Sequence, residues 1–317
     1  MRALLLVSSL IFASAAAVAA PPPQCRQMAV TIDDLPIASM KDDTASWEAI
    51  TTGLLRTLRE RGVPAYGFVN EGKCVVNGVR DPRRVALLSR WLDAGLELGN
   101  HSYSHKSLHA LPLADYQTDV ARGEAVLTEI LRKRRQRLEF YRHPFLQTGL
   151  DLETKTAFER FLAERHVRVA PVTIDNAEWI YSRAFEKDPS ARERIGVAYL
   201  DYMEAKAAYW ERQSVRLFRR EVKQVLLIHA NALNAAFLGP LLDRFRARGY
   251  DLIPLREALE DPAYTSPDLF VGRGGISWLH RWALSVRSSR EAAASLLEPD
   301  EPSPPAWVME MAGVTSE

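Results

Sequence analysis

From Met28 onward, the chain alternates between short apolar runs and longer stretches with helical periodicity. The apolar runs predict seven strands, at residues 28–32, 63–69, 96–100, 139–143, 167–173, 224–228 and 250–254. The amphipathic stretches predict helices at residues 46–61, 82–94, 114–134, 152–165 and 234–248. Strands and helices that alternate at these lengths indicate right-handed β-α-β units. We therefore expect an α/β fold in which about seven parallel strands form a barrel, or an incomplete one, rather than a sandwich.

One long segment interrupts this alternation. Residues 179–221 form a mostly helical insertion between the fifth and sixth strands, and Tyr199, Tyr202, Tyr209 and Trp210 lie on it. Aromatic faces can stack on sugar rings, but spacings of three and seven place most of these residues on one helical stripe. That pattern favours packing against the barrel.

The periodicity fades near the end of the chain. We expect the barrel to occupy residues 26–262 and a separate C-terminal region to occupy residues 263–317. Glycines and aromatic residues within residues 272–282 suggest an ordered strap. Residues 298–305 are rich in proline and acidic side chains, which predicts a disordered tail.

The first nineteen residues, 1–19, have the pattern of an export signal. Arg2 precedes a short apolar stretch, and a run of alanines ends at Ala17-Val18-Ala19. The apolar stretch is too short to favour a permanent membrane helix, and an uncleaved anchor is the alternative. Because no other segment is long and apolar enough to span a bilayer, we expect export to the periplasm or medium without stable membrane insertion.

The two cysteines of the chain, Cys25 and Cys74, would meet an oxidising compartment after export. In the expected barrel Cys25 precedes the first strand and Cys74 follows the second. Only a loop folded back along the barrel would bring them within bonding distance. The sequence favours neither the bridged nor the reduced state.

Charge gives no support for a nucleic acid partner. The chain has 41 basic and 40 acidic residues, and removal of the signal would take away Arg2 and leave a neutral balance. The basic run over residues 132–137 falls at the expected end of a helix, where cations favour the helix dipole and face solvent. The oligomeric state stays open.

Polar groups able to carry chemistry follow the expected strands. Asp33 and Asp34 end the first strand, His101 and His105 follow the third, Arg142-His143-Pro144-Phe145 ends the fourth, residues 175–179 follow the fifth, and His229 ends the sixth. In a parallel barrel the carboxyl ends of the strands meet on one face. We therefore expect these groups to form one site.

Adjacent carboxylates at Asp33 and Asp34 are costly in an apolar strand, because like charges repel and burial penalises both. A divalent cation relieves this cost: one carboxylate and two imidazoles can bind it while the second carboxylate stays free for proton transfer. A helix cap or turn is the structural alternative for the pair. His101 and His105 in the third loop favour a metal-dependent hydrolase.

Three other histidine assignments follow from position. His109 lies four residues beyond His105, as in a helical metal pair, but it falls in a separate turn, whereas His101 sits directly at a strand end. We place His109 at the surface or near the site rather than among the ligands. His143 is expected to pack or to line the cleft, and His229 could be a core histidine instead of a reacting group.

Five motifs, in this order, resemble those of the polysaccharide deacetylase family, which includes chitooligosaccharide and peptidoglycan deacetylases. Thr31-Ile32-Asp33-Asp34 resembles the opening T-F-D-D, and residues 95–105 resemble G-H-E-I-G-N-H-[ST]-x-x-H. Residues 142–145 are similar to R-x-P-[FY], residues 175–179 to D-x-x-D-W, and residues 226–229 to the closing L-x-x-H. The matches extend from Met28 to about Leu255.

The resemblance implies a distorted (β/α) barrel of about seven parallel strands and hydrolysis of an N-acetyl or O-acetyl group on a glycan. Asp34, His101 and His105 would bind one divalent ion, most often zinc, with cobalt, manganese or nickel also compatible. The ion would acidify a water molecule and polarise the acyl carbonyl. Asp33 would act as general base, and His229 would protonate the leaving amine.

The resemblance also assigns supporting roles. Arg142 would orient Asp33 and balance its charge, and Asp175 would tune His229. Glu178 replaces the second Asp of its motif and lengthens the carboxylate nearest that histidine, which leaves its own role open.

Three residues would contact the substrate. Trp179 would form part of the apolar wall beside the acetyl methyl. Pro144 and Phe145 would line the site, with a backbone N–H near Phe145 helping to hold the oxyanion. Phe145 lacks the hydroxyl of the family's tyrosine, and Leu35 and Pro36 stand where many members have a glycine.

The leading hypothesis is therefore an exported, metal-dependent hydrolase that deacetylates an acetylated oligo- or polysaccharide. The same site would attack other acyl groups, so an amidase or esterase acting on a non-glycan substrate is the second hypothesis. The third is a glycan-binding envelope protein that has lost catalysis. The presence of the base, the three ligands and the acid argues against the third.

Overall fold

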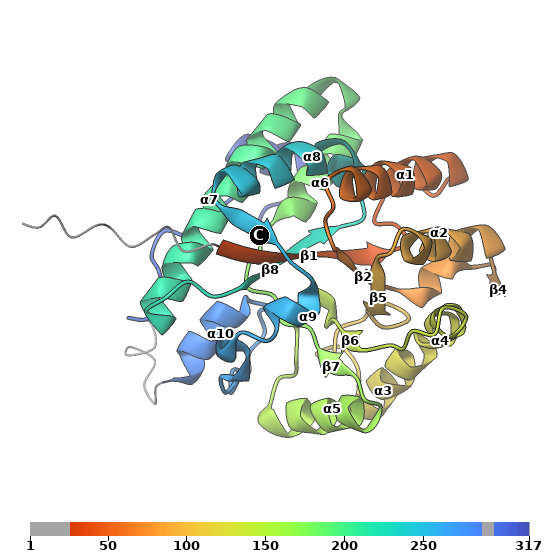
Figure 1. Ribbon diagram of the computed structural model, residues 1–317, viewed down its shortest axis with the longest axis horizontal. Helices are drawn as coiled ribbons and strands as arrows, with labels where there is room; N and C mark the ends of the chain where they lie inside the picture. Colours follow the sequence, from red (N-terminus) through yellow and green to blue (C-terminus); the bar gives the residue numbers. More distant parts are fainter. Residues whose placement is uncertain (1–25, 287–294, 317) are drawn as a thin grey trace, which may run out of the picture.

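Seven parallel strands form one curled sheet in the order β7-β6-β5-β2-β1-β8, with β9 paired to β1 and helices around the outside (Figure 1). The computed structural model describes residues 26–286 and 295–316. The strands of this sheet are β1 (Arg26–Leu35), β2 (Tyr66–Val69), β5 (Glu97–Asn100), β6 (Phe140–Tyr141), β7 (Arg168–Val169), β8 (Gln224–His229) and β9 (Tyr250–Leu252). The predicted parallel α/β architecture is confirmed, and each of the seven predicted strands overlaps one of these.

Strand β1 lies at the centre of the sheet. It pairs with β8 along residues 28–33, and on its other side with β9 at its start and with β2 at its end. Its side chains are buried on both faces, as its apolar sequence requires. The register with β2 shifts between Ile32 and Leu35. This irregularity falls at the two aspartates.

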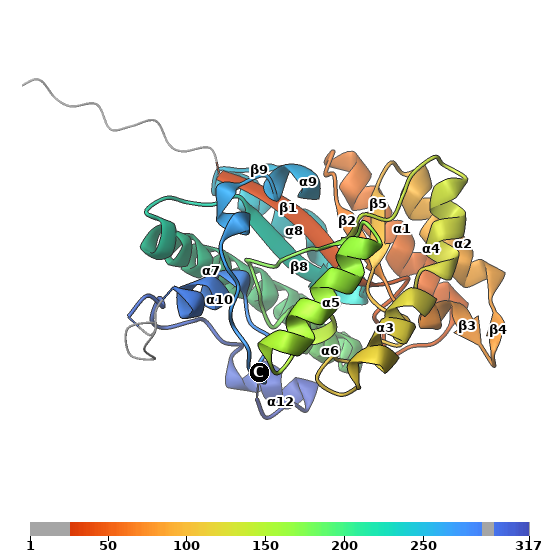
Figure 2. The ribbon, with the colours of Figure 1, turned by 90° about the horizontal axis from the view of Figure 1, so that it is seen from below.

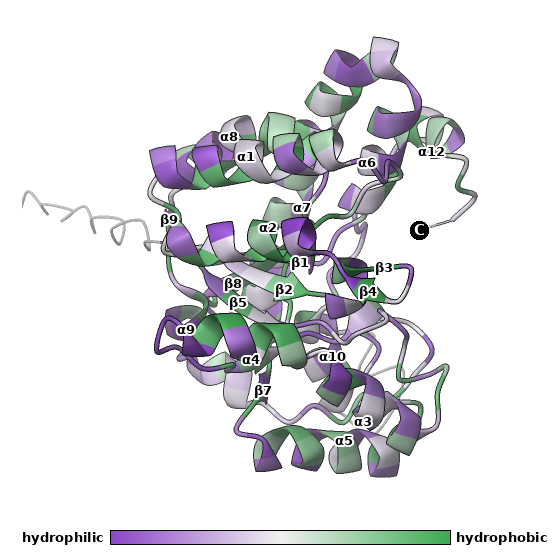
Figure 3. Ribbon diagram, turned by 90° about the vertical axis from the view of Figure 1, so that its right-hand side faces the viewer, coloured by the Kyte–Doolittle hydropathy of each residue, from purple (hydrophilic) through white to green (hydrophobic). Residues whose placement is uncertain are grey.

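The sheet closes on itself through the segment that follows β7. Ile174 forms a bridge with Leu226 on β8, and the N–H groups of Thr173 and Ile174 reach the carbonyl of Val225. The carboxyl ends of the strands are thereby brought around one face. A short antiparallel hairpin, β3 (Val75–Val76) with β4 (Val79–Arg80), and helix α12 (Ala306–Ala312) lie at the end of the molecule opposite β9 and α9 (Leu255–Ala258) (Figure 3).

Helices cover the sheet; the five predicted helices form, one of them with a break, and α10 (Trp278–Ser285) lies where an ordered strap was expected. The helices are α1 (Thr44–Glu60), α2 (Pro82–Asp93), α3 (Leu113–Arg122), α4 (Ala125–Arg132), α5 (Leu152–Glu164), α8 (Ala232–Ala247) and α10. The side chains of Asp43, Asp81, Asp151 and Asn231 cap α1, α2, α5 and α8. Short 3-10 turns are η1 (Glu71–Cys74), η2 (Pro144–Leu146) and η4 (Pro262–Thr265).

The single helix expected over residues 114–134 is in fact α3 and α4, separated at Gly123. A Cβ at Gly123 would lie 2.8 Å from the backbone of Ser102 and 2.8 Å from that of Tyr103. Glycine therefore lets this turn approach the loop that follows β5. Helical periodicity continues across the break, which is why the sequence predicts one helix.

The insertion is helical, as expected. It comprises α6 (Glu178–Lys187), the turn η3 (Pro189–Ala191) and the long α7 (Arg192–Phe218). The aromatic stripe is buried: Tyr199, Tyr202, Tyr209 and Trp210 are each at most 6% exposed. The prediction that these rings pack rather than bind sugar is confirmed.

The tail prediction is wrong. Residues 298–305 lie against α7: Glu298 pairs with Arg212 and Arg216, and Glu301 with Lys206. Helix α12 then packs against α6, as Figure 2 shows. The proline-rich, acidic composition has the look of a disordered segment, but its acidic groups match basic groups on the insertion. Because those partners lie some 80 to 100 residues earlier, local composition does not reveal them.

Two expectations fall outside the described residues, namely the export signal over residues 1–19 and the position of Cys25. Cys74 is buried and forms no disulfide within the described part of the chain. Among the described residues, none of the helices combines the length and the apolar character needed to cross a bilayer.

Candidate active site

Asp34, His101 and His105 converge at the carboxyl ends of β1 and β5. Oδ1 of Asp34 lies 3.3 Å from Nε2 of His105 and 3.6 Å from Nε2 of His101. One donor atom from each of the three residues lies within 4.8 Å of the others. One carboxylate oxygen and two imidazole nitrogens at this spacing can surround a divalent ion.

The donor atoms are oriented for a cation. Nδ1 of His101 lies 2.8 Å from the carbonyl oxygen of Arg142, which can only accept, so this nitrogen carries the proton and Nε2 keeps its lone pair. Burial lowers the pKa of both His101 and His105, which keeps them neutral. Oδ1 of Asp34 is buried without a hydrogen-bond partner. These residues fit a divalent metal ion.

The ligand loop after β5 adopts an uncommon backbone conformation. Ser102 has φ 66° and His105 has φ 55°, in the left-handed region that costs non-glycine residues energy. Hydrogen bonds hold this shape: the N–H of Ser102 donates to the side chain of Asn100 at 2.7 Å, and the N–H of His105 donates to Oγ of Ser102 at 3.0 Å. Asp34 also lies in this region, with φ 70°.

Asp33 lies beside the three ligands without joining them. It is buried, and its Oδ2 is 3.8 Å from Nε2 of His101 and 4.0 Å from Nη1 of Arg142. Burial raises its pKa to about 6, against the opposing charge of Arg142. Arg142 is itself fully buried and donates to Oγ1 of Thr31 at 2.9 Å. The arrangement suits a carboxylate that accepts a proton near neutral pH.

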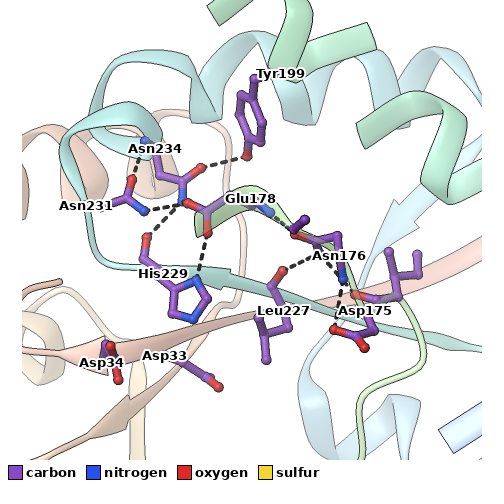
Figure 4. Close-up of polar contacts among 12 residues, drawn as sticks. Asp33, Asp34, Asp175, Asn176, Glu178, Tyr199, Leu227, His229, Asn231 and Asn234 are labelled. Atoms are coloured by element: carbon purple, nitrogen blue, oxygen red, sulfur yellow. Dashed lines mark hydrogen bonds and ion pairs between the residues drawn. The ribbon is translucent and has the colours of Figure 1, made fainter. Parts of the chain in front are cut away.

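His229 is held by Glu178, not by Asp175, which corrects the expectation above. Nδ1 of His229 lies 2.7 Å from Oε2 of Glu178. Figure 4 shows the ring between Glu178 and the two aspartates of β1. Burial alone would lower the pKa of His229, but the Glu178 carboxylate outweighs it and raises the pKa to about 9. His229 therefore carries a proton at neutral pH.

Sequence reasoning missed the hydrogen-bond network that fixes Glu178. Its Oε1 accepts from the side-chain amides of Asn231 at 2.5 Å and Asn234 at 2.6 Å. Tyr199, on the insertion helix α7, donates to Oδ1 of Asn234 at 2.7 Å (Figure 4). The visible signal at Asn231 is a helix cap, which indicates a local role only.

Asp175 shapes the loop instead. Its side chain accepts from the N–H of Asn176, and its carbonyl accepts from Nε1 of Trp210 at 2.8 Å. It lies on the far side of Leu227 from the histidine in Figure 4. Because α6 begins at Glu178, the longer side chain at the helix start reaches His229.

A cavity of about 600 Å³ opens above these residues. Asp33, Asp34, the two histidine ligands, Asp175 and His229 line it, together with Phe145, Trp179, Lys206 and Glu301. Phe145 and Trp179 are 57% and 41% exposed, whereas Pro144 is buried. The structure thus brings Phe145 and Trp179 to the cavity, and it places Pro144 behind Phe145 at the start of η2.

The other histidines considered from sequence lie apart from the ligands. Nε2 of His109 accepts from the N–H of Gly149 at 3.1 Å. His143 is buried against the rings of Tyr141 and Phe158. Their contacts are structural.

Comparison with known proteins finds one matching family model. A model of the family described as polysaccharide deacetylase matches residues 20–157. A search of curated proteins finds no match.

The solved structures similar to this chain include BA3943 from Bacillus anthracis, described as a CE4 family pseudoenzyme. It has 15% sequence identity, a TM-score of 0.50, and coverage of 75% of this chain and 66% of that one. A BA3943 mutant described as having restored enzymatic activity gives 17% identity, a TM-score of 0.50, and coverage of 75% and 69%. The chain thus spans about two thirds of those proteins, and the likeness shows a shared fold.

The residues matched by the family model include Asp33, Asp34, His101, His105 and Arg142. Their order along the chain and their convergence at one end of the curled sheet agree with that match. Residues 20–157 of this chain are therefore similar to the polysaccharide deacetylase family.

Proposed function

We propose that this protein is a metal-dependent hydrolase that removes acetyl groups from an N-acetylated or O-acetylated glycan outside the cytoplasm. One observation carries the proposal most directly. A buried carboxylate with a pKa near 6, Asp33, and a protonated imidazole with a pKa near 9, His229, stand beside three convergent metal donors. Two titratable groups of such different proton affinity supply a base and an acid in the same pH range.

Asp34, His101 and His105 would hold one divalent ion, for which zinc is our first choice because two imidazoles and a carboxylate suit it. When bound, such an ion supplies Lewis acidity toward the acyl oxygen and toward a water molecule. Metal identity is a proposal that rests on ligand chemistry alone.

The chain's own groups then divide the proton transfers. Asp33 accepts a proton from the attacking water, and Arg142, 4.0 Å away, keeps the carboxylate oriented and partly balanced. His229 donates its Nε2 proton to the departing amine or alkoxide. Glu178 accepts a hydrogen bond from Nδ1 of His229 and so fixes the orientation of the ring. A backbone N–H near Phe145 stabilises the developing oxyanion, and Trp179 forms an apolar wall for the acetyl methyl.

The substrate assignment follows from the family and the cavity. A space of about 600 Å³ with two exposed aromatic faces accommodates a few sugar units. Export, proposed from the pattern of residues 1–19, would place the protein where such glycans occur.

Acetate release tests the proposal. Purified protein, freed of metal with a chelator and then given Zn²⁺, should release acetate from acetylated chitooligosaccharides or peptidoglycan fragments. Activity that survives both the chelator and Asp33→Asn would contradict the mechanism. Turnover of acylated small amines in preference to glycans would favour an amidase or esterase.

The pseudoenzyme description of BA3943 makes a non-catalytic role a second outcome. The assembled base, ligands and acid argue against it. Tight metal binding with no turnover of any acylated compound would establish it.

A further inference from the structure

The two carboxylate oxygens of Asp34 face different partners. Oδ1 points to the two histidines, whereas Oδ2 lies 3.3 Å from Nζ of Lys73. The same Nζ donates to the backbone carbonyl of Asp34 at 3.1 Å. Lys73 thus contacts both the side chain and the backbone carbonyl of Asp34. Lys73 is not part of any of the sequence motifs that predict the site.

The position of Lys73 is fixed from both sides by the turn η1. The N–H of Gly72 donates to the carbonyl of Tyr103 at 2.9 Å, and a Cβ at Gly72 would come within 2.5 Å of that oxygen. Arg84 donates to the carbonyl of Lys73 at 2.9 Å. Oε1 of buried Glu71 accepts from the N–H of Leu127 at 2.7 Å. The turn η1, which packs on the loop that carries His101 and His105, therefore fixes the position of the Lys73 ammonium.

This placement has a consequence for coordination. A carboxylate can bind a cation through one oxygen or through both. With Oδ2 ion-paired to the ammonium of Lys73, only Oδ1 of Asp34 is available beside His101 and His105. The positive charge also withdraws electron density from the carboxylate, so less charge is donated to a bound ion.

We propose that Lys73 is a positioning residue that restricts Asp34 to one-oxygen coordination of the divalent ion, leaving a coordination position for substrate and keeping the ion a strong Lewis acid. The proposal rests on the metal-dependent function above. It predicts opposite effects on two properties: loss of Lys73 weakens catalysis but does not weaken metal binding, because an ammonium repels a cation while it orients the ligand.

The test uses Lys73→Met, with Lys106→Met as matched control. Lys106 is exposed and follows His105 directly, so its loss removes the same charge from the same neighbourhood. Titration calorimetry with Zn²⁺ measures affinity, and visible absorption of the Co²⁺-loaded protein reports coordination number, since intensity falls as ligands are added. Acetate release gives kcat and KM.

For Lys73→Met we expect Zn²⁺ affinity equal to or tighter than that of the unaltered protein, weaker Co²⁺ absorption, and kcat lower by about 10- to 100-fold with little change in KM. Lys73→Arg, which keeps a charged donor, should restore much of the absorption and kcat. Lys106→Met should leave all four quantities unchanged.

Weaker Zn²⁺ binding by a folded Lys73→Met protein, with unchanged Co²⁺ absorption, would overturn the proposal and leave Lys73 a structural support for the turn. The Co²⁺ measurement requires no substrate. If the unaltered protein releases no acetate, the proposed function fails, whereas the spectrum still decides the role of Lys73.

Discussion

Asp33 and His229 are register partners on the adjacent parallel strands β1 and β8. Neighbouring strands lie about 4.8 Å apart, so this pairing alone brings the two side chains together at the same strand ends. Burial raises the pKa of Asp33, whereas Glu178 overcomes burial to raise that of His229. The fold thus sets the proposed base and the proposed acid side by side through backbone register.

The first prediction concerns pH. His229 is protonated below a pKa of about 9, so kcat/KM should fall as pH rises through that value. Glu178→Gln removes the charge that favours the imidazolium, so this basic limb should move to lower pH. The pH profile of acetate release measures the shift. Glu164→Gln, on the exposed end of α5, serves as control, and a limb that stays in place in Glu178→Gln would refute the assignment.

A second prediction separates the adjacent aspartates. Asp33→Asn should reduce kcat by about 10²- to 10⁴-fold while Zn²⁺ affinity is retained, because the base is lost and the ligands stay. Asp34→Asn should lose Zn²⁺ binding as well as activity. Calorimetry and acetate release on both variants make the comparison. Equal loss of metal from the two would mean that Asp33 is also a ligand.

Asn234→Leu should disturb the acid through Glu178. The change removes one donor to a buried carboxylate and also the acceptor of Tyr199, so unfolding free energy should fall by about 1–3 kcal/mol. Because His229 is then less well oriented, kcat should fall more than KM changes. Urea denaturation and steady-state kinetics measure the two effects. A loss of stability with unchanged kcat would confine the network to structure.

Gly123→Ala should weaken metal binding from outside the site. The added Cβ would press on the backbone of Ser102 and Tyr103 at 2.8 Å, in the loop that carries both histidine ligands. Such overpacking costs about 1–3 kcal/mol. Gly274→Ala, whose Cβ meets its nearest neighbour at 3.6 Å, is the control. Zn²⁺ titration of the two variants should differ, and equal affinity would show that the loop adapts.

The C-terminal segment gives a fifth prediction. Glu301→Ala removes a partner from the buried ammonium of Lys206, so the free energy of unfolding should fall by about 1–2 kcal/mol, measured by urea denaturation. The dependence of activity on oligosaccharide length should change as well, because Glu301 lines the cavity. An unchanged chain-length profile would assign the segment to stability alone.

The sequence was sufficient for the fold and for the convergence of Asp34, His101 and His105. Sequence runs with apolar residues marked all seven strands, even β6 and β7, which have only two residues each. Asp34, His101 and His105 stood at strand ends, where the topology of a parallel sheet dictates that side chains meet.

The remainder depends on contacts that spacing does not encode. The start of α6 at Glu178 decides that Glu178, and not Asp175, contacts His229. Lys73 reaches Asp34 because η1 packs on the loop that carries the two histidines. The acidic tail is matched by basic residues on α7 far earlier in the chain. Each of these three contacts joins segments that lie apart in the sequence, and the local pattern of one segment does not indicate the other.

The placement of Glu301 beside the cavity bears on the order in which the protein matures. Synthesis runs from the N-terminus, so the proposed metal donors Asp34, His101 and His105 are made before Glu301 emerges. A partly synthesised barrel would then be able to bind the proposed ion. It would still lack Glu301, one of the residues that line the cavity. Under the proposed function, capture of the ion would thus precede enclosure of the substrate by the segment that carries Glu301.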